Sequence, residues 1–106
     1  MASEVGYVEQ TGEKNFRGVL KLLTYQGEIE FVPCISEREN APEMLVYSRG
    51  VEIGSASRRI GKSSGKEHVS IALKHPQITN GRPVLFANLG KKPDQDDDRV
   101  FSIIMN

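Results

Sequence analysis

The sequence predicts an all-β protein, built as a small antiparallel β-sandwich or a partly open β-barrel of seven to eight short strands. Ten glycines and five prolines among 106 residues leave few stretches long enough for a helix of three turns. Several segments instead alternate apolar and polar side chains with the two-residue period of a strand. Turn-forming residues separate these segments at intervals of about 8 to 12 residues, which is typical of antiparallel sandwiches and barrels. We expect residues 1–106 to form one domain.

The first three strands are predicted at Val5–Gln10, Phe16–Tyr25 and Glu28–Ile35. The second of these segments alternates with a period of two, which places Phe16, Gly18, Leu20 and Leu22 on one face. Pro33 lies inside the third segment and cannot donate a hydrogen bond to a neighbouring strand. We therefore expect an edge strand or a bulge at Pro33.

Five further strands are predicted at Met44–Ser48, Val51–Ile60, Glu67–His75, Val84–Leu89 and Val100–Met105. The segment 36–42 is predicted to be a loop with room for one helical turn. Arg49-Gly50 predicts a tight turn between two strands, and the Gly- and Ser-rich segment 60–66 predicts a flexible hairpin loop. Asn80-Gly81 is a strong turn signal, and residues 90–99 are predicted to be a polar loop.

Composition excludes several classes of protein. The formal net charge is zero, so no global field marks a nucleic-acid or membrane binder. Cys34 is the single cysteine, which excludes an internal disulfide and a four-cysteine zinc site. No apolar run approaches the roughly 18 residues of a membrane span, and Met1-Ala2-Ser3-Glu4 does not resemble a signal peptide. We expect a cytoplasmic protein with no membrane partner.

The motifs that resemble chemistry are incomplete. Gly61-Lys62-Ser63 resembles the end of a phosphate-binding loop, but Ala56 stands where the first glycine is needed. The acidic segment 94–98 resembles the start of a calcium loop, but Arg99 stands where that loop needs glycine. Cys34 follows a proline in an apolar strand, where an inert thiol is the usual outcome. We therefore expect no enzyme activity, no catalytic residues, no cofactor and no metal site.

The distribution of charge stands out from this background. Residues 58–92 hold eight basic residues and one acidic residue, a net charge of +7 in a neutral chain. Clustered cations neutralise nucleic-acid phosphates, so this segment predicts a basic face that binds DNA. The candidate nucleic-acid-binding residues are Arg58, Arg59, Lys62, Lys66, Lys74, Arg82, Lys91 and Lys92. The alternative is a solvated surface that the acidic parts of the chain balance in space.

Short motifs in a fixed order span nearly the whole chain. They are Phe16-x-Gly18, Asn40-Ala41-Pro42, Gly50-Val51-Glu52-Ile53-Gly54, Val69-Ser70-Ile71-x-Leu73 with Pro76, Ala87-Asn88-Leu89 and Phe101-Ser102-Ile103-Ile104. This order resembles a small bacterial family known as domain of unknown function 736. The resemblance implies a compact β-rich domain, often carried by plasmids and conjugative elements, with no assigned catalytic residues.

The chain departs from that family pattern at three places. Family members tend to carry tryptophan near the positions of Ser57 and Met105, whereas this chain has no tryptophan. An acidic pair that the family tends to show before the proline is replaced here by Lys74-His75. A binding surface that used the tryptophan or the acidic pair would differ in this member.

Two functions follow as hypotheses from these patterns. The first is a non-enzymatic DNA-binding accessory protein of a mobile genetic element, which docks phosphates on the basic face of residues 58–92. The alternative is a protein-binding inhibitor or adaptor, for example in anti-defence, which acts on a host or element-encoded protein through an edge strand. Convergence of the basic side chains on one surface would favour the first hypothesis.

Overall fold

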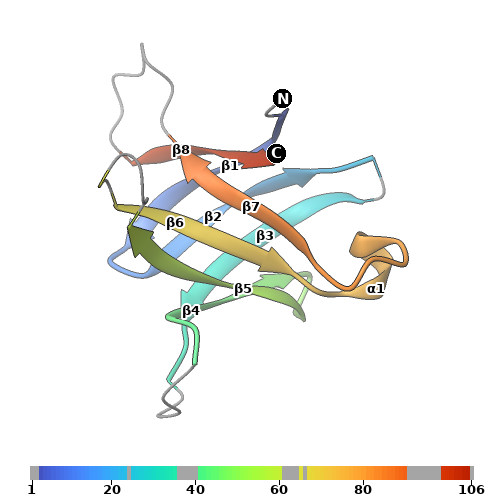
Figure 1. Ribbon diagram of the computed structural model, residues 1–106. Helices are drawn as coiled ribbons and strands as arrows, with labels where there is room; N and C mark the ends of the chain where they lie inside the picture. Colours follow the sequence, from blue (N-terminus) through green and yellow to red (C-terminus); the bar gives the residue numbers. More distant parts are fainter. Residues whose placement is uncertain are drawn as a thin grey trace.

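A computed structural model describes residues 3–23, 25–35, 41–60, 65, 67–90 and 99–105. Within these residues, eight antiparallel strands form a closed barrel in which each strand pairs with its neighbours in sequence and β8 pairs with β1 (Figure 1). The elements are β1 (Ser3–Gly12), β2 (Asn15–Lys21), β3 (Gln26–Pro33), β4 (Met44–Ser48), β5 (Val51–Ile60), β6 (Glu67–Leu73), α1 (Pro76–Thr79), β7 (Leu85–Gly90) and β8 (Val100–Met105). The all-β antiparallel prediction is confirmed, and the barrel is the architecture that the chain adopts.

The expected edge strand is wrong, because β3 pairs with both β2 and β4, and β8 pairs with both β7 and β1. Pro33 fits into the barrel because it is the last residue of β3. Phe31 is the last β3 residue in register with β2, opposite Phe16, whereas Pro33 pairs with Met44 of β4. The missing N–H of Pro33 therefore interrupts no ladder with β2. Closure removes the strand edge that the protein-binding alternative required.

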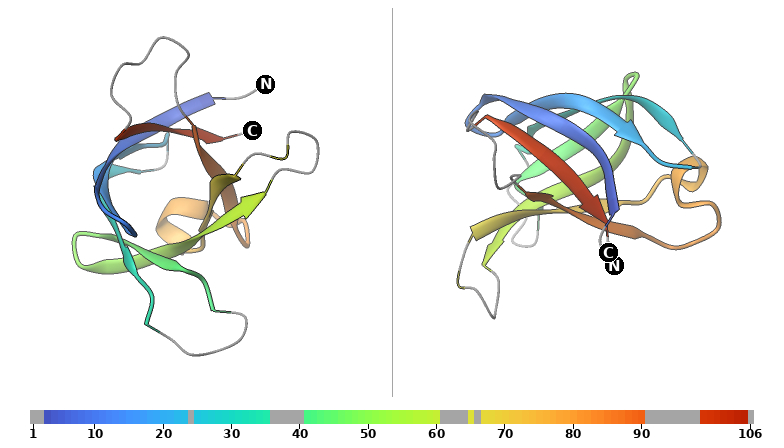
Figure 2. Two further views of the ribbon diagram at one scale, coloured as in Figure 1. Left: turned by 90° about the vertical axis from the view of Figure 1, so that its left-hand side faces the viewer. Right: turned by 90° about the horizontal axis from the view of Figure 1, so that it is seen from above.

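The strand directions give the barrel two different ends. At the helix end lie α1, the Arg49–Gly50 turn, and the paired residues Ser3 and Met105. At the far end, β1 turns into β2, and β3, β5 and β7 finish. Figure 2 shows α1 across one end of the ring of strands.

Alternate residues of each strand point inward and fill the barrel. An eight-stranded barrel is just wide enough for side chains to occupy its interior. Phe16 packs against Phe31 and Phe101, with ring centroids 5.5 Å and 5.7 Å away, respectively. The buried core side chains are those of Val8, Phe16, Leu20, Leu22, Ile29, Phe31, Met44, Val46, Ile53, Ala56, Ile71, Leu73, Ile78, Ala87, Leu89 and Ile103.

The short helix α1 closes the helix end of the barrel. His75 caps it, with Nδ1 accepting a hydrogen bond from the Gln77 N–H at 3.2 Å, and Pro76 supplies the first helical residue. Asn80 ends the helix in the left-handed conformation, with φ of 51°. Ile78 is only 1% exposed and belongs to the core. The sequence predicted only a turn here, because a helix of four residues is too short to show a period.

The predicted tight turn at Arg49-Gly50 is confirmed. Both residues have positive φ, 53° and 79°, as a type I′ hairpin turn requires. The Arg49 guanidinium lies over the Tyr25 ring, 5.9 Å from its centroid. The Tyr25 hydroxyl is hydrogen-bonded to Ser48 Oγ, which donates to the backbone oxygen of Glu28 at 2.7 Å. These contacts tie the β4–β5 turn to β3 and to the β2–β3 connection.

Gly18 allows β1 and β2 to approach closely. A Cβ at this position would overlap the carbonyl oxygen of Tyr7 and lie 2.6 Å from the Cα of Val8. Both of these atoms belong to the backbone of β1, so no side-chain rotation could make room. The curvature of the wall at this point therefore requires a residue without a side chain.

Candidate functional site

The outer surface of β5, β6 and β7 carries three rows of side chains that face away from the core. Cross-strand pairing sets the rows: Ser55, Ala72 and Phe86 form the first, Ser57, Ser70 and Asn88 the second, and Arg59 and His68 the third. Their outward direction follows from strand alternation, because the intervening residues Ala56, Ile71 and Ala87 are buried in the core. These eight outward residues are called the β5–β7 face below.

Phe86 stands beside a shallow hollow of about 180 Å³ on this face. Its side chain is 64% exposed, and its cross-strand neighbour Ala72 is too small to cover the ring. The hollow exists because the neighbouring side chains are short. It is lined by Ser55, Ala56, Ser57, Arg59, Ser70, Ala72 and Phe86.

The β5–β7 face carries no carboxylate on any of its eight residues. Its cation, Arg59, lies in register opposite His68 near the far end of the barrel. Glu43 is an acidic residue at the β4 flank, where its Oε2 accepts a hydrogen bond from the Arg58 backbone N–H at 2.8 Å. The Glu43 N–H in turn donates to Ser57 Oγ at 3.2 Å. The Glu43 carboxylate is thus engaged by the β5 backbone, beside the face and outside the lining of the hollow.

Arg58 does not share this surface with Arg59. Arg58 pairs in register with Val69, whose side chain packs against the core, whereas Arg59 pairs with the outward-facing His68. The Arg58 guanidinium donates to the backbone oxygen of Glu13 in the β1–β2 turn at 3.0 Å. The structure therefore gives Arg58 a bridging position at the far end of the barrel.

Lys74 and Arg82 lie at the helix end of the barrel. Lys74 follows β6, and its position is six residues beyond His68, which is about 20 Å along a strand. It lines a separate hollow of about 440 Å³ together with Glu52 and His75. Arg82 is exposed in the turn after α1. The four described candidates, Arg58, Arg59, Lys74 and Arg82, thus do not converge on one surface.

The other four candidates, Lys62, Lys66, Lys91 and Lys92, lie outside the described residues. Ile60 and Gly90, where β5 and β7 end, are at the far end of the barrel, as is Arg59. The predicted role of the four lysines stays a prediction.

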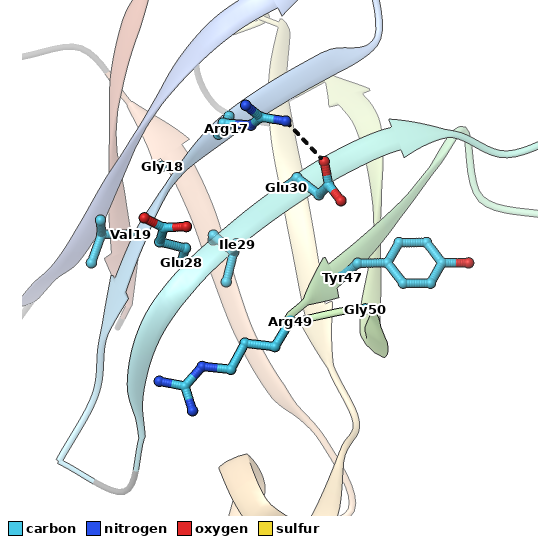
Figure 3. Close-up of a pocket in the computed structure, with 9 residues that line it drawn as sticks. All are labelled: Arg17, Gly18, Val19, Glu28, Ile29, Glu30, Tyr47, Arg49 and Gly50. Carbon is cyan, nitrogen blue, oxygen red and sulfur yellow. Dashed lines mark ion pairs between the residues drawn. The ribbon is translucent and has the colours of Figure 1, made fainter.

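A larger pocket of about 500 Å³ lies on the outside of β2, β3 and β4. Its charges are mixed: Arg17 and Glu30 form an ion pair at 3.6 Å, and Glu28 and Arg49 also line it (Figure 3). Both members of the ion pair are substantially exposed to solvent, and they face each other across β2 and β3. A cross-strand surface pair of this kind supports the sheet and presents no net charge to a ligand.

Other chemistry is sparse in the part of the chain that the structure describes. No group of three or more His, Cys, Asp or Glu side chains there lies close enough to hold a metal ion. Cys34 is a free thiol and half-buried, in the segment that follows β3. No described helix has the length and hydrophobicity that crossing a membrane requires.

Comparison with known families assigns the chain as a whole. Residues 4–106 match the family described as "Protein of unknown function (DUF736)". The chain belongs to this family. Searches of curated proteins and of solved structures found no match. The family resemblance inferred from the order of the short motifs is confirmed over essentially the whole chain.

Phe86 is the residue of the β5–β7 face that sequence reasoning did not select. The segment Val84–Leu89 was predicted as a strand, and in it Ala87 and Leu89 occupy the core parity. Alternation therefore assigns Phe86 and Asn88 to the outer surface. An aromatic residue on the polar parity of a strand is the signal that could have found it.

Proposed function

We propose that the protein is a non-enzymatic, cytoplasmic nucleic-acid-binding module of a mobile genetic element, and that the β5–β7 face is its binding surface. The observation that carries the proposal is the combination of Arg59 and the exposed ring of Phe86 around one hollow. Nucleic-acid-binding sheets combine cations for phosphates with aromatic rings for bases. The absence of carboxylates from the eight residues of this face removes a source of repulsion for a polyanion.

Arg59 is the cation that the β5–β7 face offers to a phosphate, since Arg58, Lys74 and Arg82 lie elsewhere on the barrel. The planar guanidinium of an arginine donates paired hydrogen bonds to phosphate oxygens, which fits Arg59 for a backbone contact. Ser70 and Asn88, which face each other across β6 and β7, add hydroxyl and amide groups next to the hollow.

Fluorescence anisotropy of labelled single- and double-stranded DNA tests the proposal at about 50 and about 200 mM salt, because phosphate contacts weaken steeply over this range. The informative variant is Arg59→Glu, and its matched control is Lys21→Glu, which changes the charge equally at an exposed position of β2. We expect Arg59→Glu to weaken binding at low salt and to lower the salt slope by about one unit. Lys21→Glu should bind as the wild type does.

Absence of binding to any DNA at low salt would overturn the proposal, as would an equal loss in the two variants. A protein partner would then become the leading hypothesis. Affinity purification from a nuclease-treated lysate would test it, with recovery of a stoichiometric partner as the criterion. Such a partner would not bind by adding a strand to the described sheet, since the described strands form a closed barrel.

A further inference from the structure

The Phe86 side chain is exposed to solvent and lines the hollow of the β5–β7 face. A single exposed apolar side chain is common on protein surfaces and needs no explanation. Here, however, Phe86 of β7 has Ala72 of β6 as its cross-strand neighbour, and Ala72 in turn pairs with Ser55 of β5. This row of short side chains forms the floor of the hollow next to the ring. The surroundings of Phe86 thus provide space for a flat group beside an aromatic ring.

We propose that the β5–β7 face binds single-stranded nucleic acid, with one unpaired base stacked on Phe86 and an adjacent phosphate on Arg59. This inference rests on the proposed function and names its substrate class. Arg59 and Phe86 line the same hollow, so one short stretch of nucleic acid can reach both. The hollow is small, about 180 Å³, and opens directly to solvent beside the ring.

The chemistry of the remaining face residues fits an unpaired strand. A base in a duplex is stacked on both sides by its neighbours, so an external ring such as that of Phe86 has no free base surface to contact. An unpaired base exposes both its surface and its hydrogen-bonding edge. Ser70 and Asn88, one row away from Phe86, offer hydroxyl and amide groups to that edge. Stacking tolerates every base, which predicts little sequence preference.

The test uses the absence of tryptophan from the chain. Phe86→Trp introduces a single fluorophore at the proposed stacking position. We expect a thymine oligonucleotide to quench its emission, because a base in contact with the indole provides the quenching group. Inorganic polyphosphate, which carries phosphates without bases, should leave the emission largely unchanged even where it binds.

Anisotropy of a labelled oligothymidine then measures the energetic contribution of the ring. Phe86→Ala should weaken single-strand binding about 5- to 150-fold and leave duplex binding, which we expect to be weaker, unchanged. The matched control is Tyr7→Ala, which removes another exposed aromatic side chain, on β1, outside the β5–β7 face. It should bind as the wild type does.

The possible results separate this inference from the proposed function. If the wild-type protein binds single strands and Phe86→Ala binds equally well, stacking is refuted and nucleic-acid binding stands. If polyphosphate quenches Phe86→Trp as strongly as the oligonucleotide does, stacking is likewise refuted. If the wild type binds neither single strands nor duplex at low salt, the proposed function itself fails.

Discussion

Arg58 and Arg59 follow one another in β5 but belong to opposite sides of the barrel wall. Arg58 has the parity of the core residue Ala56 and bridges to the backbone oxygen of Glu13, 45 residues away in sequence. Arg59 lines the outer hollow with Phe86. Two adjacent cations that a charge count treats alike therefore have different physical roles.

This difference predicts that alanine substitution of Arg58 affects stability, whereas alanine substitution of Arg59 affects nucleic-acid binding. Arg58→Ala should lower the free energy of unfolding by about 1 kcal/mol, because it removes the hydrogen bond to Glu13. Arg59→Ala should leave stability within about 0.5 kcal/mol, as is usual for an exposed surface position, and should weaken nucleic-acid binding. Urea denaturation and anisotropy on the same two samples check both effects. Equal stability losses in the two variants would contradict the assignment.

Gly18→Ala should destabilise the barrel by about 2 kcal/mol or more, because the new Cβ would collide with the β1 backbone. The matched control is Gly90→Ala, whose Cβ would meet only Cδ1 of Ile104, the far end of a flexible side chain. Gly90→Ala should therefore cost much less. Thermal and urea unfolding of the two variants provide the comparison, and a similar cost for both would count against close backbone approach as the reason for Gly18.

Arg49→Asn should stabilise the protein by up to about 1 kcal/mol. Arg49 adopts the left-handed conformation, which asparagine tolerates better than arginine does, and Asn-Gly is a preferred type I′ pair. The gain is partly offset by loss of the contact between the guanidinium and the Tyr25 ring. Arg49→Lys keeps the backbone cost and changes the contact, so it isolates the side-chain contribution. A midpoint in urea for Arg49→Asn below that of Arg49→Lys would refute this explanation.

Ile78→Ala should cost about 2 to 5 kcal/mol, because Ile78 is fully buried and closes the helix end of the core. Ile60→Ala is the control, since Ile60 is 72% exposed at the end of β5. Its cost should lie within about 0.5 kcal/mol. A small effect of Ile78→Ala would show that α1 is not an integral part of the core.

Strand positions were predictable because each strand buries one face. The alternation of Val69, Ile71 and Leu73 locates β6 and assigns its outward side to His68, Ser70 and Ala72, as the structure confirms. Alternation shows which side of a strand is buried, but it does not show which strands pair with each other. Closure through β1 and β8 was therefore not predictable in this way, and Pro33 pointed to an edge that the barrel does not have.

The sequence located a basic segment, residues 58–92, but it did not show which of its side chains share a surface. Counting charges over residues 58–92 grouped Arg59 with Lys74, although the length of β6 separates their positions. Strand parity already distinguishes Arg58 from Arg59, and it also assigns Phe86 to the outside. The hollow itself depends on the register that places Ala72 between Ser55 and Phe86, which only the pairing of three strands defines.

The pairing of β1 with β8 has a consequence for synthesis of the chain. Each of the other strand pairs joins consecutive strands and can form as soon as both have left the ribosome. The last pair joins Ser3 to Met105, so one edge of β1 stays unpaired until β8 has emerged. During that interval β1 and the growing edge opposite it are open to pairing with other chains. The time between synthesis of β1 and synthesis of β8 therefore sets how long each nascent molecule carries this open edge.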